Sequence, residues 1–275
     1  AGGRTQFLLN LWEKIDKTKY EFDFLTFSRS ISYAKCIEDT GARIWYMHTY
    51  PEKNEHEFRR EFKEILNNGY DVIHIATSYW KNTIIEQMAK EAGIKKIIIH
   101  SHSAGLESKT GNYEDELKRH YKIKETISEN LATDFLACSV SSAEWLYGST
   151  ISKDKITVIH NGIDTKRFAY CEQKRKQLRY DAGLDNKYVI GFLGRLQQVK
   201  NIEYIIDLFE KIYQTNKETF LLIVGDGLLR EKLEEKMRNT FPSEVYCFAG
   251  KVKNTEDYLL EMDVLLLPSL FEGFP

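Results

Sequence analysis

The chain has 275 residues, with 39 Lys and Arg against 41 Asp and Glu, and a formal net charge of −2. At about 150 residues per domain, this length predicts roughly two domains. The balanced charge gives no reason to expect a nucleic-acid partner. An aromatic content of 13% supplies a sizeable core, which excludes a predominantly disordered chain. No run approaches the ~18 consecutive apolar residues that a membrane-spanning helix needs.

The cysteines are widely separated, and none belongs to a C-x-x-C pair. The N-terminus also lacks the basic and apolar pattern of a signal peptide. Both observations favour reduced thiols in a cytoplasmic protein over a disulfide framework or a zinc site. The four residues are Cys36, Cys138, Cys171 and Cys247.

Short apolar runs alternate with helical spacing from the start of the chain. A glycine turn at Gly2 and Gly3 leads into a predicted helix with Phe7 and Trp12 on its apolar face. A glycine turn into a helix normally follows a strand, and none precedes this one. Strands are then predicted at residues 22–27, 42–47, 72–76, 96–100, 135–138 and 157–159.

A second series of strands follows a polar stretch after Asn161-Gly162. Several strands are apolar almost throughout, which is typical of parallel strands covered on both faces. Between them, one predicted helix has an isoleucine-rich face, and another begins with Leu228, Leu229 and Leu233. The alternation predicts an α/β fold with two Rossmann-like lobes, residues 1–163 and 164–275. The second series comprises residues 188–193, 220–224, 245–249 and 264–267.

Glycine and charge recur where the strands of the second lobe end, which is where open α/β sheets bind ligands. Gly194-Arg195 and then Lys200 precede the isoleucine-rich helix, an arrangement that suits a phosphate. Solvated loop charges are the alternative for both cations. Gly225-Asp226-Gly227 and Gly250-Lys251-Val252 follow the next two strands, although Asp226 fits a plain strand-to-helix turn. Together these loops predict a crevice for a phosphate-bearing ligand.

In the first lobe, the fourth strand runs directly into His100 and His102. We expect these two imidazoles to point to opposite sides, so that only one faces a given ligand. The alternative is a satisfied polar residue at the sheet margin, and His74 is interpreted as structural in this way. No H-x-x-x-H, D-x-D, G-x-S-x-G or P-loop pattern occurs. A metal site, a Ser/His/Asp triad and ATP hydrolysis are therefore not expected.

In order and spacing, these elements resemble the retaining glycosyltransferases of family four, which have the two-lobed GT-B architecture. The likeness covers almost the whole chain. Within the family, the sequence most resembles bacterial capsule and exopolysaccharide transferases. The matching elements are Ala1-Gly2-Gly3, His100, Ser139-Val140-Ser141 before Trp145, residues 158–164, Gly194-Arg195-Leu196, Lys200-Asn201, Gly225-Asp226-Gly227 and Glu272-Gly273-Phe274-Pro275.

The resemblance implies transfer of a sugar, with retention, from a nucleotide diphosphate donor such as a UDP-sugar to a glycan or lipid-linked acceptor. It implies no cofactor and no essential metal. Arg195 and Lys200 match the cations that neutralise the leaving diphosphate, and His100 matches the histidine that faces the reacting sugar. The remaining donor-side matches are Gly2, Gly3, Gly194, Gly225, Lys251, Val252, Glu272, Gly273 and Phe274, and His102 is assigned to the acceptor.

The family pattern is incomplete at both ends of the chain. The second glutamate of the family's E-x7-E element would lie beyond Pro275. We therefore expect both lobes to be truncated, with the first N-terminal strand and the C-terminal end of the second lobe missing. Two alternatives keep the same fold: a UDP-sugar 2-epimerase, and a non-catalytic subunit that binds sugar nucleotides.

A basic and aromatic helix face suggests peripheral contact with the inner face of a membrane. Lys118, Arg119, Lys122 and Lys124 surround Tyr121 there. A solvated helix face is the alternative for such a run.

Overall fold

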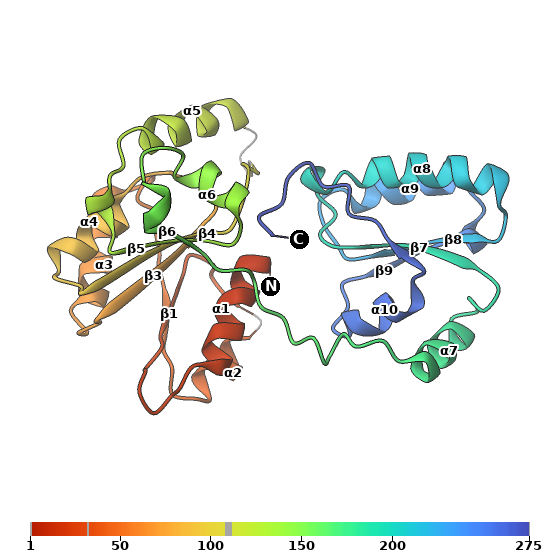
Figure 1. Cartoon of the computed structure of the whole chain (residues 1–275), viewed down its shortest axis with the longest axis horizontal. Helices are drawn as coiled ribbons and strands as arrows, with labels where there is room; N and C mark the ends of the chain where they lie inside the picture. The colour runs from red at the N-terminus through yellow and green to blue at the C-terminus, as the bar shows by residue number, and fades with distance from the viewer. Residues whose placement is uncertain (1, 32, 108–111, 275) are drawn as a thin grey trace. The chain divides into compact units, whose positions relative to one another are not determined.

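The computed structural model describes residues 2–31, 33–107 and 112–274, so Ala1 and Pro275 lie outside the described part. The chain forms two compact units (Figure 1). The first unit comprises Ala1–Ile163 together with Glu272–Pro275, and the second comprises Asp164–Phe271. The sequence placed residues 272–275 in the second lobe. They group with the first unit because the Gly273 backbone lies against His102 and accepts hydrogen bonds from two serine hydroxyls.

All ten predicted strands are present, with ends within two residues of the expected positions. Four of them form a parallel sheet in the first unit, in the order β3-β4-β5-β6. The remaining two strands of the first unit, β1 and β2, pair in parallel as a separate sheet. The six strands are β1 (Phe24–Thr26), β2 (Ile44–Tyr46), β3 (Val72–Thr77), β4 (Lys96–Ser101), β5 (Asp134–Ala137) and β6 (Ile156–Val158).

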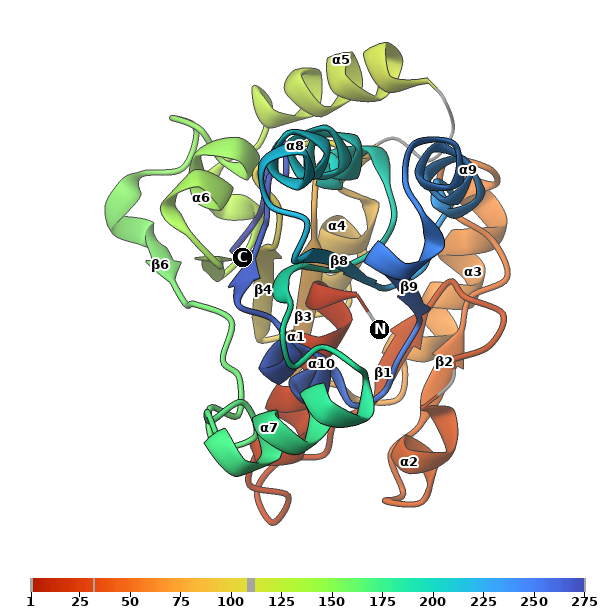
Figure 2. The same ribbon diagram turned by 90° about the vertical axis from the view of Figure 1, so that its right-hand side faces the viewer.

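The helices of the first unit cover the two faces of its larger sheet. Ile73, Ile75 and Ile97 pack with α3 and α4, and Figure 2 shows β1 and β2 beside α3. The even-numbered residues of β3 and β4 point to the opposite face, where α1 contributes Phe7. The helices are α1 (Gly3–Lys14), α2 (Ala34–Glu38), α3 (Glu55–Leu66), α4 (Ile84–Glu91), α5 (Tyr113–Lys124) and α6 (Val140–Leu146).

The second unit is a parallel sheet in the order β10-β7-β8-β9 with helices on both faces, α8 and α9 on one and α10 on the other (Figure 1). Its apolar strands are therefore covered on both sides, as the sequence predicted. The strands are β7 (Tyr188–Leu193), β8 (Thr219–Val224), β9 (Tyr246–Gly250) and β10 (Val264–Leu265). The helices are α7 (Glu172–Asp181), α8 (Ile202–Thr215), α9 (Arg230–Thr240) and α10 (Thr255–Glu261).

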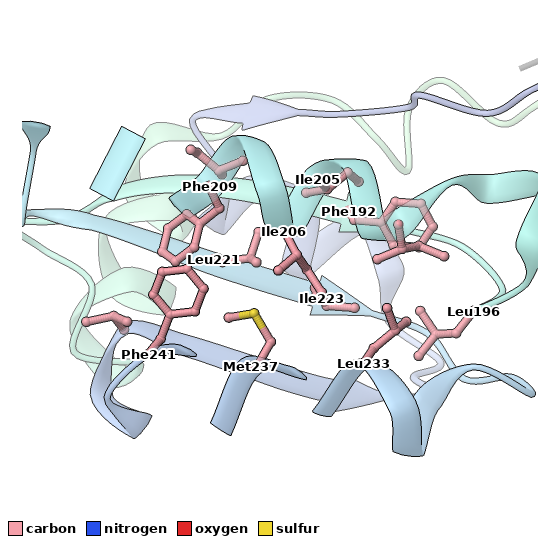
Figure 3. Close-up of a cluster of buried hydrophobic side chains, with 13 residues drawn as sticks. Phe192, Leu196, Ile205, Ile206, Phe209, Leu221, Ile223, Leu233, Met237 and Phe241 are labelled. Atoms are coloured by element: carbon pink, nitrogen blue, oxygen red, sulfur yellow. The ribbon is translucent and has the colours of Figure 1, made fainter. Parts of the chain in front are cut away.

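The main core of the second unit lies between the sheet and helices α8 and α9 (Figure 3). Phe209 of α8 is fully buried and contacts Phe241, with their ring centroids 5.0 Å apart. Leu221 and Ile223 of β8 face this core, whereas Leu222 and Val224 face the cluster next to α10. Strand residues two apart thus share a layer, and the sheet holds both cores together.

One predicted helix begins later than the sequence indicated. Leu233 is buried on α9, but Leu228 is 92% exposed because the helix begins only at Arg230. Leu228 therefore belongs to the preceding turn, not to the apolar face of the helix.

Candidate functional site

In the first unit, three histidines and a phenylalanine form a compact group that we call the imidazole cluster: Phe7, His74, His100 and His102. The ring centroids of His100 and His102 are 4.0 Å apart, and those of His74 and His100 are 5.4 Å apart. Phe7 lies 4.9 Å from His100 and 5.0 Å from His102. The cluster joins α1 to the middle of β3 and to the end of β4.

This arrangement corrects one prediction. His100 and His102 do not point to opposite sides, because residues two apart in extended chain share a face. The extended chain continues past β4, where the His102 amide donates to the Thr77 carbonyl oxygen at 2.9 Å. His74, interpreted from the sequence as structural, lies with its Nε2 3.2 Å from Nδ1 of His100.

The three imidazoles are held in their uncharged form. Burial lowers the pKa of His100 to about 3, with further contributions from His102 and His74. Burial likewise lowers the pKa of His74 and of His102 to about 4. Near neutral pH the cluster can therefore donate or accept hydrogen bonds, but it cannot supply a positive charge.

One buried nitrogen of the cluster, Nε2 of His100, has no hydrogen-bond partner among the described residues, whereas His102 interacts with the Asn161 side chain. A buried polar atom without a partner costs on the order of 1–3 kcal/mol. Such atoms are expected where a ligand completes the hydrogen bonding. The imidazole cluster is thus the strongest candidate binding site of the first unit.

The segment Glu272–Phe274 lies beside this cluster. A Cβ atom on Gly273 would be only 2.2 Å from the His102 carbonyl oxygen, so the close approach requires glycine. The Gly273 carbonyl oxygen accepts hydrogen bonds from the Ser139 and Ser142 hydroxyls. The Phe274 ring stacks on His160 at 4.5 Å. The Gly273 backbone is therefore held next to that of His102.

Ser139 takes part in this arrangement because it is also the N-cap of α6. Its hydroxyl oxygen accepts a hydrogen bond from the Ser142 amide at 3.1 Å. The sequence indicated a Ser-x-Ser element before this helix but not the contact with Gly273, which joins residues more than a hundred positions apart.

Gly2 and Gly3 stand at the start of α1, with Gly2 as its N-cap. A Cβ atom on either glycine would meet nothing within 4 Å. The protein itself therefore does not require glycine at these positions, whereas a ligand that approaches the backbone closely would.

In the second unit, the glycine loops that follow β7 and β8 cross each other closely. A Cβ atom on Gly225, whose φ is +134°, would lie 1.8 Å from the Gly194 carbonyl oxygen. A Cβ atom on Gly227 would lie 2.5 Å from the Leu196 carbonyl oxygen. The glycines are therefore needed for the packing of one loop on the other.

The amides of these glycines already donate hydrogen bonds within the unit. The Gly194 amide donates to the Val224 carbonyl oxygen at 2.9 Å. The Gly225 amide donates to the Gly250 carbonyl oxygen at 2.8 Å. The Gly227 amide donates to the Asp226 carboxylate at 2.8 Å, which supports the interpretation of Asp226 as a turn residue. The sequence predicted that these loops let the backbone approach an anion; the structure adds that the amides of Gly194, Gly225 and Gly227 are already hydrogen-bonded within the unit.

The two cations of the second unit follow β7. Arg195 is exposed directly after the strand, and Lys200 is half-buried at the end of a short 3-10 helix, Gln198–Lys200. Asn201 precedes α8 with a left-handed backbone, φ 51°, and gives the helix N-terminus no side-chain cap. Cationic side chains and an uncapped helix start thus lie in one loop, a combination that suits an anion.

Lys251 and Val252 follow β9, whose last residue, Gly250, accepts the hydrogen bond from Gly225. Lys251 is exposed, and Val252 packs against the cluster next to α10. The loops after β7, β8 and β9 therefore stand at one edge of the sheet, as the sequence predicted.

The structure divides the predicted site residues between the two units. His100, His102, Gly2, Gly3 and residues 272–274 belong to the first unit, and the other predicted site residues belong to the second. Among the described residues, no group of three or more His, Cys, Asp or Glu is placed to hold a metal ion. Within the same residues, no helix has the length and apolarity needed to span a membrane.

Sequence reasoning missed Phe7, His74 and Ser142 as parts of the site. A signal for His74 was present, because it and His100 occupy neighbouring parallel strands that the pattern had identified. The contacts of Phe7 had no such signal, since helical periodicity identifies an apolar face but not its partner.

Both halves of the chain match families of known proteins. Residues 1–167 match the family described as Glycosyltransferase Family 4, and residues 174–275 match the one described as Glycosyl transferases group 1. EpsF of Bacillus subtilis (strain 168), which is named as a glycosyltransferase, is 28% identical over 280 residues. That match covers 100% of this chain and 72% of EpsF.

A second relative is the UDP-Gal:alpha-D-GlcNAc-diphosphoundecaprenol alpha-1,3-galactosyltransferase of Escherichia coli. It is 27% identical over 220 residues, which cover 78% of this chain and 56% of the relative. Among solved structures, Anabaena Alr3699/HepE in complex with UDP aligns with a TM-score of 0.74 at 16% identity, over 98% of this chain and 71% of that one. This likeness confirms the two-lobed GT-B fold. Because the first family match covers 167 of the 275 residues, the chain belongs to Glycosyltransferase Family 4.

Proposed function

We propose that this protein transfers a sugar from a nucleotide diphosphate donor, a UDP-sugar, to a glycan or lipid-linked acceptor in cell-surface polysaccharide synthesis. The configuration at the anomeric carbon is retained. The observation that carries the proposal is that both halves of the chain match glycosyltransferase families. The relative named for UDP-Gal and diphosphoundecaprenol supports the donor and the acceptor class, and the UDP complex of HepE supports the nucleotide.

The second unit binds the donor in this proposal. Arg195 and Lys200 neutralise the diphosphate as negative charge builds on the leaving oxygen, which is where positioned cations lower a barrier most. The close crossing of the Gly194 and Gly225 loops supplies a rigid support for the two side chains. Lys251 and Val252 contact the nucleobase.

In the first unit, His100 faces the reacting sugar and His102 faces the acceptor. The unpartnered Nε2 of His100 supports its role, because sugar hydroxyls can both donate and accept hydrogen bonds. Glu272 contacts the donor sugar, and Gly273 and Phe274 hold it in place. The open space at Gly2 and Gly3 admits the donor phosphate.

No resident metal or cofactor takes part in the proposed reaction. The support is the presence of Arg195 and Lys200, which supply the positive charge that a bound cation would otherwise provide at the diphosphate. Activity is therefore expected to persist in excess EDTA. Loss of activity in EDTA that Mg²⁺ or Mn²⁺ restores would contradict this part of the proposal.

The test of the function is product analysis by mass spectrometry with a panel of UDP- and GDP-sugars and an undecaprenyl-diphosphate-linked acceptor. A product with a UDP-sugar is expected, and the anomeric coupling constant of its new linkage measured by NMR should match that of the donor. Arg195→Ala combined with Lys200→Ala should lower kcat/KM by about a hundredfold or more, whereas exposed Lys217→Ala is the matched control. Conversion of donor without acceptor would indicate a 2-epimerase, and no conversion at all a non-catalytic subunit.

We also propose that α5 contacts the inner face of the membrane, where a lipid-linked acceptor would be reached. Lys118, Arg119, Tyr121 and Lys122 are exposed on this helix. Lys124 contributes less than the sequence suggested, because its ammonium group donates to the Glu144 carbonyl oxygen at 2.8 Å. Sedimentation with vesicles containing anionic lipid should exceed that with neutral vesicles. Equal sedimentation with both would contradict the contact.

A further inference from the structure

The hydrogen bond between His74 and His100 has a consequence for the chemistry of the cluster. Nε2 of His74 and Nδ1 of His100 are 3.2 Å apart, and the two rings are nearly parallel, with an angle of 9° between their planes. His74 lies on β3 and His100 on β4, and these strands are paired over six residues. The contact is thus set by the sheet itself.

Only one proton can occupy this hydrogen bond when both rings are neutral, and burial keeps both neutral near pH 7. Either His74 donates from Nε2, or His100 donates from Nδ1. A free neutral imidazole side chain carries its proton mainly on Nε2. Donation from His74 lets both residues keep that preferred form, whereas donation from His100 forces both into the other one.

The opposite nitrogen of His100 is therefore protonated. This Nε2 is buried and has no hydrogen-bond partner among the described residues. Phe7 and His102 pack beside the His100 ring and supply no partner to the atom. His100 thus presents an N–H donor, held in a fixed direction, to whatever enters the site.

We infer that His74 is a positioning residue for His100: it fixes the ring orientation and the tautomer so that the His100 Nε2–H group donates to an oxygen of the sugar substrate. This inference rests on the proposed function for the identity of the ligand. The hydrogen bond and the tautomer do not depend on it.

The direct test is the tautomer of His100 in the intact protein. Protein labelled with ¹⁵N-histidine is examined by long-range ¹H–¹⁵N correlation spectra near pH 7.5, with His100 assigned by its loss in His100→Gln. The expected spectrum has the His100 proton on Nε2. A proton on Nδ1, or a mixture of the two tautomers, would overturn the inference without any need for a variant at position 74.

The second test compares two substitutions of His74. His74→Phe keeps a planar ring but removes the donor, so His100 should sample both tautomers, and kcat should fall about tenfold with little change in KM for the donor. His74→Gln carries an amide N–H at a similar reach, and it should restore the tautomer and much of kcat. Equal kcat in the two variants would contradict a positioning role.

His120 provides a matched control because it is fully buried but outside the cluster. Its Nδ1 accepts a hydrogen bond from the Trp80 amide at 3.1 Å. His120→Gln should lower thermal stability while the His100 tautomer stays unchanged. A tautomer change in this variant would mean that general destabilisation, not His74, controls His100. An Nε2–H tautomer in a protein without transfer activity would leave the positioning intact and refute the proposed function instead.

Discussion

The candidate sites of the two units are built in different ways. At β3 and β4 of the first unit, imidazole side chains are buried against each other and against Phe7, and Nε2 of His100 has no partner among the described residues. At β7 and β8 of the second unit, backbone N–H groups of the crossing glycine loops donate to backbone carbonyl oxygens, and Arg195 beside them is exposed. The first site depends on side-chain burial, and the second depends on the absence of Cβ atoms. They should therefore fail under different perturbations.

The tryptophans allow the two units to be followed separately. Trp12, Trp45, Trp80 and Trp145 are the four tryptophans of the chain, and all lie in the first unit. Unfolding followed by tryptophan fluorescence therefore reports on the first unit, whereas far-ultraviolet circular dichroism reports on both.

The largest effect is expected from Gly225→Ala. The new methyl group would collide with the Gly194 carbonyl oxygen, and the backbone at φ +134° is strained for any residue with a Cβ atom. We expect the free energy of unfolding of the second unit to fall by about 3 kcal/mol or more. In urea this appears as an early transition in circular dichroism but not in fluorescence. Gly3→Ala, where a Cβ atom meets nothing within 4 Å, should change stability by less than about 1 kcal/mol. Equal losses in the two variants would refute the distinction between the glycines.

The next effect concerns Glu86, a carboxyl on α4 that is only 4% exposed. Burial raises its pKa to about 7 from its ordinary value of 4.5. A raised carboxyl pKa means that the folded state retains a proton that the unfolded chain has lost, so stability falls as the pH rises from 4.5 through 7. Glu86→Gln should thus stabilise the first unit by about 2 kcal/mol at pH 8.5 and by little at pH 5.

Urea unfolding followed by fluorescence at both pH values measures this difference. Glu91→Gln, an exposed substitution at the end of the same helix, serves as the control and should change stability little at either pH. A stabilisation by Glu86→Gln that is equal at pH 5 and pH 8.5 would rule out the titration of Glu86 as its cause.

A smaller effect of opposite sign is expected from the imidazole cluster. The folded pKa of His100 is lowered to about 3 from 6.5, so only the unfolded chain takes up this proton as the pH falls from 7 to 5. Stability is lost in that window. His100→Gln should remove about 1–2 kcal/mol of the loss between pH 7 and pH 5, measured by fluorescence. An unchanged pH dependence would show that His100 becomes protonated in the folded protein.

The smallest effect is expected from Ser139→Ala. This change removes the N-cap of α6 and one of the two hydroxyls that donate to Gly273. The free energy of unfolding of the first unit, measured by tryptophan fluorescence, should fall by about 1 kcal/mol. Ser141→Ala, an exposed change two residues away, should have almost no effect. Similar results for both serines would mean that the Gly273 contact contributes nothing to the first unit.

Much of the fold could be predicted because parallel strands covered on both faces leave continuous apolar runs, as in Leu221–Val224. The glycines of the second unit were also visible, since a loop that crosses another closely excludes side chains. Why glycine occurs at these positions was only partly predicted. The sequence indicated loops that bind an anion, and the structure adds that Gly225 has no room for a Cβ atom. Residues 272–274 were identified as a motif, but the sequence did not show that they group with the first unit.

From the sequence alone, the class of fold, the boundary near residue 163 and the family resemblance could be determined, because these depend on local periodicity and on the order of short motifs. Only the tertiary structure brought together His74, His100, His102 and Phe7, which come from two strands, a following loop and a distant helix. Strand register and helix packing decide such contacts. The pKa values of these histidines follow from the same burial, which no single stretch of sequence encodes.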